Sequence, residues 1–132
     1  MNSNFETEEY PLQEETYVLI GIAMEVHRVL GPGFSEIVYK DALEYEFKKA
    51  AIEYEREKKF VVNYKDTILP HHFCADFVIF GEIILEAKSK SKIMEEYYAR
   101  VINYLTVSKL KVGLILNFHE RSLVYKRVVS SR

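Results

Sequence analysis

The stretch "ADFVIFGEIILEAK", residues 75–88, contains two apolar runs on either side of Gly81. Two such runs, rich in β-branched and aromatic residues and separated by a glycine, are typical of a β-hairpin. Asp76 precedes the first run, Glu86 follows the second, and Lys88 comes two residues later. Because residues two apart in a strand face the same side of a sheet, Glu86 and Lys88 should project from one face. Placing charged groups at the end of buried strands costs free energy unless they are paired or bind a ligand.

The register of this hairpin decides whether the two carboxylates meet. Asp76 and Glu86 lie at equal distances in sequence from Gly81. If residues 80–82 form a three-residue loop, Asp76 lies directly opposite Glu86, with Cβ atoms about 4.5–5.5 Å apart. A two-residue loop would instead place Asp76 opposite Ala87, with its side chain on the other face. The sequence allows both registers.

In the first register, two carboxylates that repel each other need a compensating charge. Mg²⁺ prefers oxygen ligands, binds through one or two carboxylates and keeps its other positions for water and substrate phosphate. Lys88 could orient or help to deprotonate the attacking water, or stabilise charge on a phosphorane-like transition state. The three residues therefore suggest metal-assisted phosphodiester hydrolysis. A surface ion pair between Glu86 and Lys88 at the rim of the sheet is the alternative, because short motifs of this kind also occur without function.

Outside the hairpin, the hydrophobic periodicity predicts the order helix, helix, three strands, helix, two strands. Thr16 is the expected N-cap of the first helix, and Gly31 and Pro32 end it. This order indicates a single mixed α/β domain over residues 16–132, preceded by an acidic segment over residues 1–15. The helices are expected over residues 16–30, 34–51 and 92–110, and the strands over residues 55–65, 69–80, 82–88, 111–118 and 122–129. The main apolar residues of the second helix are expected to be Phe34, Ile37, Val38, Leu43 and Phe47.

Composition favours one soluble globular domain. The chain has 132 residues, of which 48% are hydrophobic, and only three are prolines. Cys74 is the only cysteine, which excludes an internal disulfide, fits a reducing compartment and suggests a small buried side chain. The first residues lack the pattern of a signal peptide, and the longest uncharged apolar run is too short to cross a bilayer. We therefore expect a cytoplasmic protein that does not associate with membranes.

The charge is distributed unevenly along the chain. Residues 1–83 carry 8 Lys and Arg against 16 Asp and Glu, whereas residues 84–132 carry 10 against 4. Such an asymmetry can hold a polyanion on one face of a protein whose net charge is only −2. A solvated charged surface would give similar counts, so the distribution alone does not decide between the two.

Four segments in this order resemble the GxxExxY proteins, a family placed in the PD-(D/E)xK nuclease superfamily. They are "VHRVLGPGFSEIVYKDAL" (26–43), "ADFVIFGEIILEAKS" (75–89), "INYL" (102–105) and "VGLILNF" (112–118), and the resemblance extends from about Ile20 to Val129. It implies a restriction-endonuclease-like core, in which helices flank a mixed sheet of about five strands and the site lies at the 75–88 hairpin.

The resemblance also implies roles for individual residues. Asp76 matches the first acidic position, and Glu86 and Lys88 match the (D/E)xK element. The backbone carbonyl of Ala87 would be a further ligand of a Mg²⁺ or Mn²⁺ cofactor. Glu36 matches a helical glutamate that completes such sites directly or through water, although a glutamate in the first turn of a helix is also favoured by the helix dipole. The catalytic residues would be Glu36, Asp76, Glu86 and Lys88.

Three further residues are expected to position the substrate. Tyr39 lies one helical turn after Glu36, and Arg100 and Tyr104 are four residues apart on a predicted helix, so each pair shares a face. Family members, like related nucleases, commonly have glutamine where this chain has Arg100, and the proline in the superfamily's name is Ala75 here. Arginine only donates hydrogen bonds. Arg100 could clamp a phosphate, or form a salt bridge to Glu36 or Glu86 in a site that no longer cuts.

The sequence therefore predicts a metal-dependent nuclease that acts on DNA or RNA. A nuclease of this size that cuts both strands would often need a homodimer. The first alternative is a nucleic-acid-binding module that has kept the fold and lost turnover, of which Arg100 would be the sign. The second is an interaction protein in which Asp76, Glu86 and Lys88 form a structural ion-pair cluster.

Overall fold

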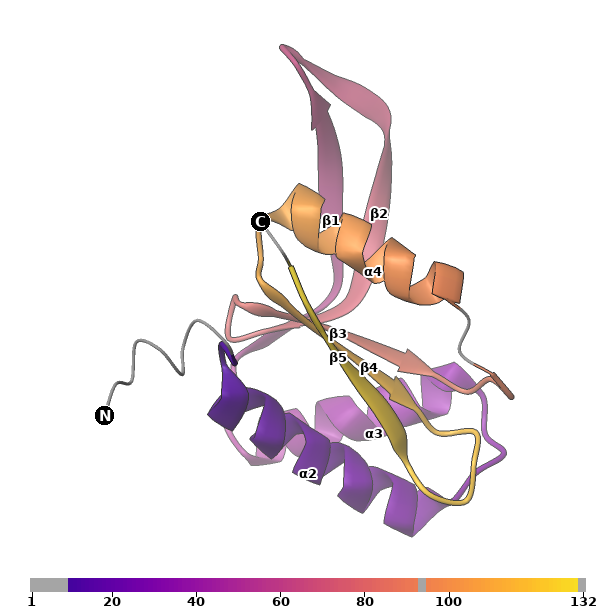
Figure 1. The fold of residues 1–132 in the computed structure, drawn as a ribbon. Helices are drawn as coiled ribbons and strands as arrows, with labels where there is room; N and C mark the ends of the chain where they lie inside the picture. The colour runs from indigo at the N-terminus through magenta and orange to yellow at the C-terminus, as the bar shows by residue number, and fades with distance from the viewer. Residues whose placement is uncertain (1–9, 93–94, 131–132) are drawn as a thin grey trace.

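The computed structural model describes residues 10–92 and 95–130, and it contains one five-stranded sheet flanked by helices (Figure 1). The strands follow each other across the sheet in the order of the sequence. β3 and β4 are parallel, and all other neighbours are antiparallel. This confirms the predicted order ααβββαββ and the mixed sheet. The elements are α2 (Gln13–Leu30), α3 (Glu36–Lys49), β1 (Tyr54–Tyr64), β2 (Thr67–Ile79), β3 (Ile83–Lys88), α4 (Glu95–Ser108), β4 (Val112–Asn117) and β5 (Val124–Val129).

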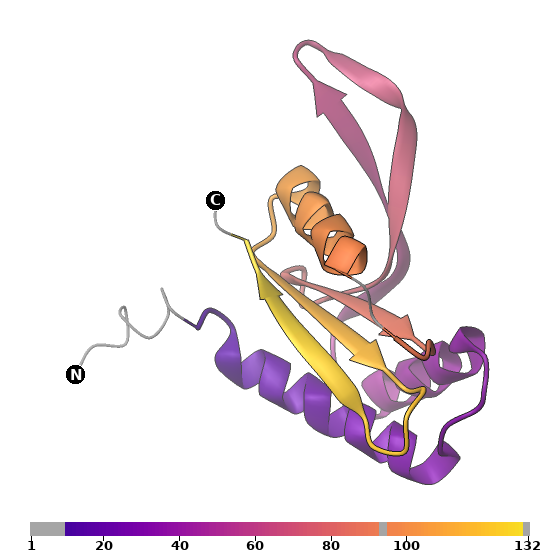
Figure 2. The same cartoon turned by 45° about the vertical axis from the view of Figure 1, so that its right-hand side comes forward.

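The helices form two layers, with α2 and α3 on one face of the sheet and α4 on the other (Figure 2). α4 connects the parallel strands β3 and β4, which require such a crossover. Ile83 and Leu85 belong to the core under α2 and α3, whereas Ile84 belongs to the core under α4. The alternation of side chains along β3 therefore places Glu86 and Lys88 on the face covered by α4.

The two N-terminal helices differ in detail from the predictions. α2 begins at Gln13, and Thr16 is not its N-cap but a buried residue of its first turn, whose hydroxyl donates to the carbonyls of Leu12 and Gln13. The predicted acidic segment over residues 1–15 lies largely outside the described residues. α3 begins at Glu36, so the predicted Phe34 lies before it, and both Phe34 and Ile37 are exposed. The side chains of α3 that are fully buried are Tyr39, Leu43 and Phe47, a narrow stripe with a spacing of four residues.

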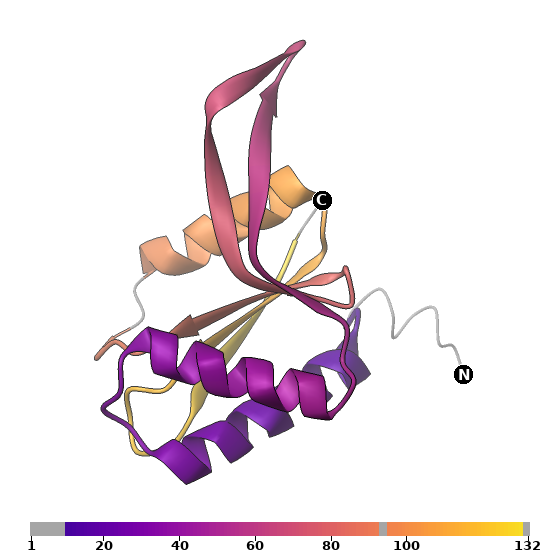
Figure 3. The same ribbon diagram turned by 180° about the vertical axis from the view of Figure 1, so that it is seen from behind.

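β1 and β2 extend beyond the rest of the sheet as a two-stranded arm (Figure 3). Cys74 pairs with Lys59 on this arm and is exposed. The prediction of a buried cysteine was therefore wrong: its neighbour Phe73 stacks on Tyr104 of α4, and because adjacent residues of a strand face opposite sides, Cys74 points away from α4. None of the helices in the described ranges combines the length and the apolar character needed to cross a membrane.

Gly113 on β4 allows α4 to approach the sheet closely. A Cβ atom added there would lie 2.8 Å from Cγ1 of Val101 on α4. Valine is stiff at χ1, so this contact cannot relax easily. We expect Gly113→Ala to lower the free energy of unfolding by about 1–3 kcal/mol in urea denaturation.

The matched control is Gly21→Ala, since Gly21 lies exposed in α2 and an added Cβ would meet nothing within 4 Å. There we expect stabilisation of about 0.5–1 kcal/mol, because alanine favours the helix. Equal effects at the two glycines would contradict the close packing of α4 on β4.

Candidate active site

The register of the β2–β3 hairpin is the one that brings Asp76 towards Glu86. Ile79 pairs with Ile83, and the pairing continues to Phe77 and Leu85. The loop therefore consists of residues 80–82, and two of them adopt positive φ, 59° at Phe80 and 66° at Gly81. Of the two registers that the sequence allows, the structure therefore has the one with the three-residue loop.

Beyond Phe77 and Leu85, side-chain carboxylates take the place of ladder hydrogen bonds. The backbone N–H of Asp76 donates to Oε2 of Glu86 at 2.9 Å, and the N–H of Ala87 donates to Oδ2 of Asp76 at 2.9 Å. The two carboxylates thus lie between the separating ends of β2 and β3. Each uses one oxygen to accept from the backbone of the other strand. The second oxygen of each, Oδ1 of Asp76 and Oε1 of Glu86, is directed to other partners.

Each of these second oxygens faces a lysine. Nζ of Lys88 is 3.7 Å from Oε1 of Glu86, and Nζ of Lys40 on α3 is 3.2 Å from Oδ1 of Asp76. Lys40 also forms an ion pair with Glu57 on β1. Burial by itself would lower the pKa of Lys40, but its contacts with Glu57 and Asp76 outweigh this and raise it. Both carboxylates therefore have a cationic partner.

Lys40 and Glu57 were not predicted from the sequence. Lys40 lies four residues after Glu36, so the same helical spacing that suggested Tyr39 could have suggested it. Glu57 had no such signal, since only the β1–β2 register places it beside Asp76. The residues on either side of Glu57 pair with Phe77 and Ala75, while Glu57 itself has a φ of 57° and leaves the ladder.

Glu86 is the buried member of the carboxylate pair, with 4% of its surface exposed. Burial, together with the charge of Asp76, raises its pKa to about 7, although the N–H of Asp76 and the charges of Lys88 and Lys40 act in the opposite direction. Near neutral pH, both the protonated and the ionised form of Glu86 are therefore populated in the metal-free protein.

Lys88 is held between Glu86 and α4. Its Nζ lies 4.5 Å from the ring centre of Tyr97, and only 12% of its side chain is exposed. Burial alone would lower its pKa, but hydrogen bonding to Tyr97 and the charge of Glu86 outweigh burial and raise it. At neutral pH Lys88 is thus an ammonium group, which can donate hydrogen bonds and stabilise negative charge.

Arg100 contacts the same tyrosine, with Cζ 5.4 Å from the centre of the Tyr97 ring. In the described part of the chain, Glu36 pairs with Lys90 and Glu86 with Lys88, so a salt bridge from Arg100 to either glutamate is not observed. An open cavity of about 350 Å³ adjoins this cation–π contact. It is lined by Lys90, Lys92, Glu96, Tyr97 and Arg100.

Glu36 begins α3 and lies at the end of β3. Its Oε2 accepts from the N–H of Ser89 at 3.1 Å and is 4.0 Å from Nζ of Lys90. Its partners are therefore Ser89 and Lys90, the two residues after Lys88. Within the described residues, Glu36 forms no hydrogen bond or ion pair with Asp76 or Glu86. Across residues 10–92 and 95–130, no three His, Cys, Asp or Glu side chains gather closely enough to hold a metal together.

Tyr39 does not lie where substrate could reach it. The side chain is fully buried and stacks on Phe118, with ring centres 4.3 Å apart. Its hydroxyl donates to the carbonyl of Gly31 at 2.5 Å and accepts from the N–H of Phe34 at 3.2 Å. The expectation that Tyr39 positions substrate is therefore corrected: the residue fixes the loop that leads into α3 and Glu36.

A test of this structural role is Tyr39→Phe, which removes both hydroxyl hydrogen bonds and leaves the ring stack intact. We expect the free energy of unfolding to fall by about 1–2 kcal/mol, because the carbonyl of Gly31 and the N–H of Phe34 lose their partner in a partly buried position. Tyr45→Phe, at an exposed position of the same helix, should change stability by less than about 0.5 kcal/mol. Equal stability of the two variants in urea would contradict the assignment.

Tyr104 packs α4 against β2. Its ring is stacked on Phe73 with centres 3.9 Å apart, and Phe73 in turn stacks on Phe60. Burial, followed by the charge of Glu86, raises the pKa of Tyr104. Although Arg100 and Tyr104 share a helix, they contact different partners, and only Arg100 lines the open cavity.

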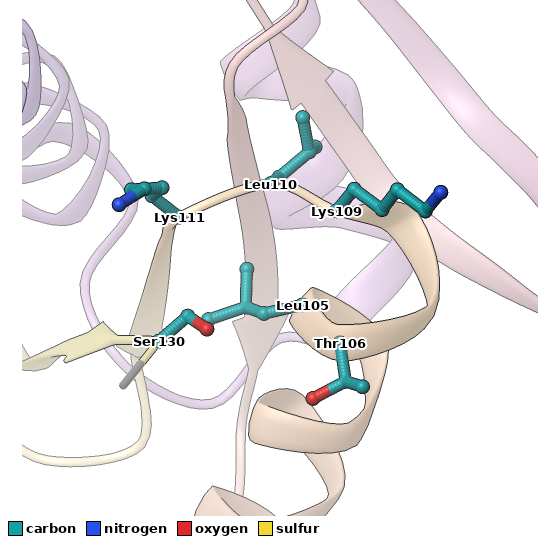
Figure 4. Close-up of a pocket in the computed structure, with 6 residues that line it drawn as sticks. All are labelled: Leu105, Thr106, Lys109, Leu110, Lys111 and Ser130. Atoms are coloured by element: carbon teal, nitrogen blue, oxygen red, sulfur yellow. The ribbon is translucent and has the colours of Figure 1, made fainter. Parts of the chain in front are cut away.

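A second cavity, of about 260 Å³, lies at the other end of α4 (Figure 4). A helix rises 1.5 Å per residue, so Thr106 in this cavity is about 13 Å along the axis from Tyr97. It is thus separate from the carboxylate pair. The lining residues are Leu105, Thr106, Lys109, Leu110, Lys111 and Ser130.

Comparison with known protein families identifies the fold. The model of the PD-(D/E)XK nuclease superfamily matches residues 13–128, which include β1 to β4, all of β5 except Val129, and both carboxylates. The chain belongs to the PD-(D/E)XK nuclease superfamily. The five-stranded mixed sheet with helices on both faces agrees with the restriction-endonuclease-like fold of this superfamily.

Among solved structures, the crystal structure of SSO0001 superimposes on this chain with a TM-score of 0.57 and 16% sequence identity. The superposition covers 70% of this chain and 48% of SSO0001, so the chain spans about half the length of that protein. At this level of identity the likeness concerns the fold. Comparison with curated proteins gives no significant match.

Proposed function

We propose that the chain is a divalent-metal-dependent nuclease that hydrolyses phosphodiester bonds of DNA or RNA. The observation that carries this proposal is the reciprocal pair of Asp76 and Glu86, in which backbone N–H groups fix one oxygen of each carboxylate at the separating ends of β2 and β3. Membership of a nuclease superfamily supports it. The narrower GxxExxY assignment, a homodimeric assembly and a cytoplasmic location stay predictions.

The residues present fit a Mg²⁺ or Mn²⁺ ion. In an extended strand, the N–H and C=O of one residue point to the same neighbouring strand. Since the N–H of Ala87 is directed at Asp76, its carbonyl faces the same gap. Two carboxylates and one carbonyl suit Mg²⁺, which keeps its remaining positions for water and phosphate. A bound ion would polarise the phosphodiester and make water more acidic. Glu36 would contact such an ion through a bound water molecule and not directly.

The other residues act on the substrate. Lys88 is fixed beside Glu86 as an ammonium group, so its role is to orient the nucleophile and to stabilise the negative charge that develops on the phosphate. Arg100 lines the open cavity and donates to a phosphate of the bound strand. Tyr104 positions the substrate indirectly, because its stack on Phe73 fixes α4 and thereby Arg100.

One observation favours the alternative of a nucleic-acid-binding or protein-interaction module without turnover. Lys40 and Lys88 already compensate the two carboxylates. Each of the two carboxylates therefore already has a cationic partner within the protein, as it would in a structural ion-pair network.

The experiment that distinguishes these functions is a cleavage assay on single- and double-stranded DNA and RNA, with Mg²⁺, Mn²⁺ or a chelator. We expect cleavage of at least one substrate that requires the metal and is lost in Asp76→Asn, which preserves the shape of the side chain. Asp66→Asn, exposed in the turn between β1 and β2, is the control that should keep full activity. Salt-dependent nucleic-acid binding without any cleavage would favour the binding module instead.

A further inference from the structure

We propose that Lys40 is an internal counter-ion of the metal site, so that a divalent ion must displace its ammonium group from Asp76 in order to bind. This inference rests on the metal site of the proposed function. It adds a residue from α3 that controls how tightly the metal is held.

The contacts of Asp76 leave one oxygen for a metal, and Lys40 occupies it. Oδ2 of Asp76 accepts from the N–H of Ala87, whereas Oδ1 is 3.2 Å from Nζ of Lys40. Only 12% of the Lys40 side chain is exposed. The ammonium group is therefore built into the site and is not a mobile surface charge.

Glu57 holds Lys40 in this position from the other side. Glu57 lies on β1 next to Asp76, it has left the β1–β2 ladder, and its carboxylate forms an ion pair with Lys40. The ammonium group thus bridges carboxylates on two adjacent strands. When a metal takes Oδ1 of Asp76, Lys40 retains Glu57 as a partner, so it can move aside without losing every counter-charge.

The charge of Lys40 should lower the affinity of the site for a divalent ion. An ammonium group and a divalent ion that compete for one carboxylate oxygen repel each other over a few ångströms, in a partly buried site where screening by water is weak. Removing the charge of Lys40 takes away this competition and leaves Glu57 as an additional nearby anion. We expect the affinity for Mn²⁺ to rise by about tenfold or more.

The test is a calorimetric titration of Mn²⁺ into the wild type and into Lys40→Met, Lys40→Arg and Lys49→Met. Lys40→Arg keeps the charge, and Lys49→Met removes a charge from an exposed position of the same helix. We expect tighter binding by Lys40→Met alone, with the other two variants close to the wild type. If Lys40→Met does not fold, Lys40→Gln replaces it, since glutamine can donate to Asp76 without a charge.

The outcomes separate this inference from the proposed function. Equal or weaker Mn²⁺ binding by Lys40→Met, with clear binding by the wild type, would overturn the role of Lys40 and leave the metal site intact. Binding of Mn²⁺ by Lys40→Met but not by the wild type would also support the inference, since it would mean that the Lys40 ammonium group prevents the metal from binding. If no variant binds Mn²⁺, the metal site and the inference both fail.

Discussion

Replacing Lys88 by methionine is expected to slow phosphodiester cleavage by about 100-fold or more while leaving Mn²⁺ binding no weaker than in the wild type. Lys88 is an ammonium group fixed between Glu86 and Tyr97, and such preorganised donors contribute about this much when they stabilise developing charge. Because Lys88 is a cation beside a metal ligand, its loss should not weaken the attraction for a divalent ion.

Single-turnover cleavage and calorimetric titration of the same Lys88→Met preparation would test this separation of roles. Lys49→Met, on the exposed side of α3, is the control for the loss of a positive charge. Asp76→Asn should lose cleavage and metal binding together, since it removes the charge of a ligand. A Lys88→Met protein that cleaves at the rate of the wild type would contradict the assignment of Lys88 to the reaction.

Glu86→Gln is expected to stabilise the metal-free protein at pH 8 by up to about 3 kcal/mol and to have little effect at pH 4. The reason is that burial and the charge of Asp76 raise the pKa of Glu86 from its usual 4.5 to about 7. The folded state binds this proton more tightly than the unfolded state does. The stabilisation from protonated Glu86 is therefore complete below pH 4.5 and is lost as the pH rises through 7.

Glutamine has no charge at any pH and can still accept from the N–H of Asp76, so the variant avoids this loss. Urea denaturation at both pH values, in the presence of a chelator, measures the difference. Glu82→Gln, exposed in the loop between β2 and β3, should show no comparable pH dependence. A Glu86→Gln protein less stable than the wild type at pH 8 would indicate that the ion pair with Lys88 outweighs the burial of charge.

If the result is as expected, Glu86 illustrates a carboxylate kept at some expense of stability. A buried glutamate that is most favourable in its protonated form lowers the stability of the fold when it ionises. Its ionised form has a use only when a cation is present to compensate it. The stability measurement therefore bears on function as well as on folding.

The geometry of the carboxylate pair could be predicted in part because it depends on local sequence. Asp76 and Glu86 are symmetric about Gly81, so the sequence narrows the hairpin to two registers, and the structure has the one with a loop of three residues. The order of the helices and strands could also be predicted, from the periodicity of the hydrophobic residues. These features follow from turn chemistry and from the alternation of apolar residues.

Lys40, Glu57 and Tyr39 depend on long-range packing, which the sequence does not specify residue by residue. Periodicity places Glu36, Tyr39 and Lys40 within one helical turn but does not decide which of them faces the core. The rotation of α3 against the sheet buries Tyr39 and directs Lys40 to Asp76. Cys74 was misjudged for a related reason, because it points to the face of β2 that α4 does not cover.

The most direct test of the metal site is a calorimetric titration of Mn²⁺ into the wild type and Asp76→Asn, with Asp66→Asn as the control for the loss of an exposed charge. The site described above predicts millimolar or tighter binding by the wild type and by Asp66→Asn, and loss of binding in Asp76→Asn. Absence of binding in all three proteins and also in Lys40→Met, at concentrations able to detect a millimolar dissociation constant, would contradict it. Asp76, Glu86, Lys40 and Lys88 would then form a structural ion-pair cluster.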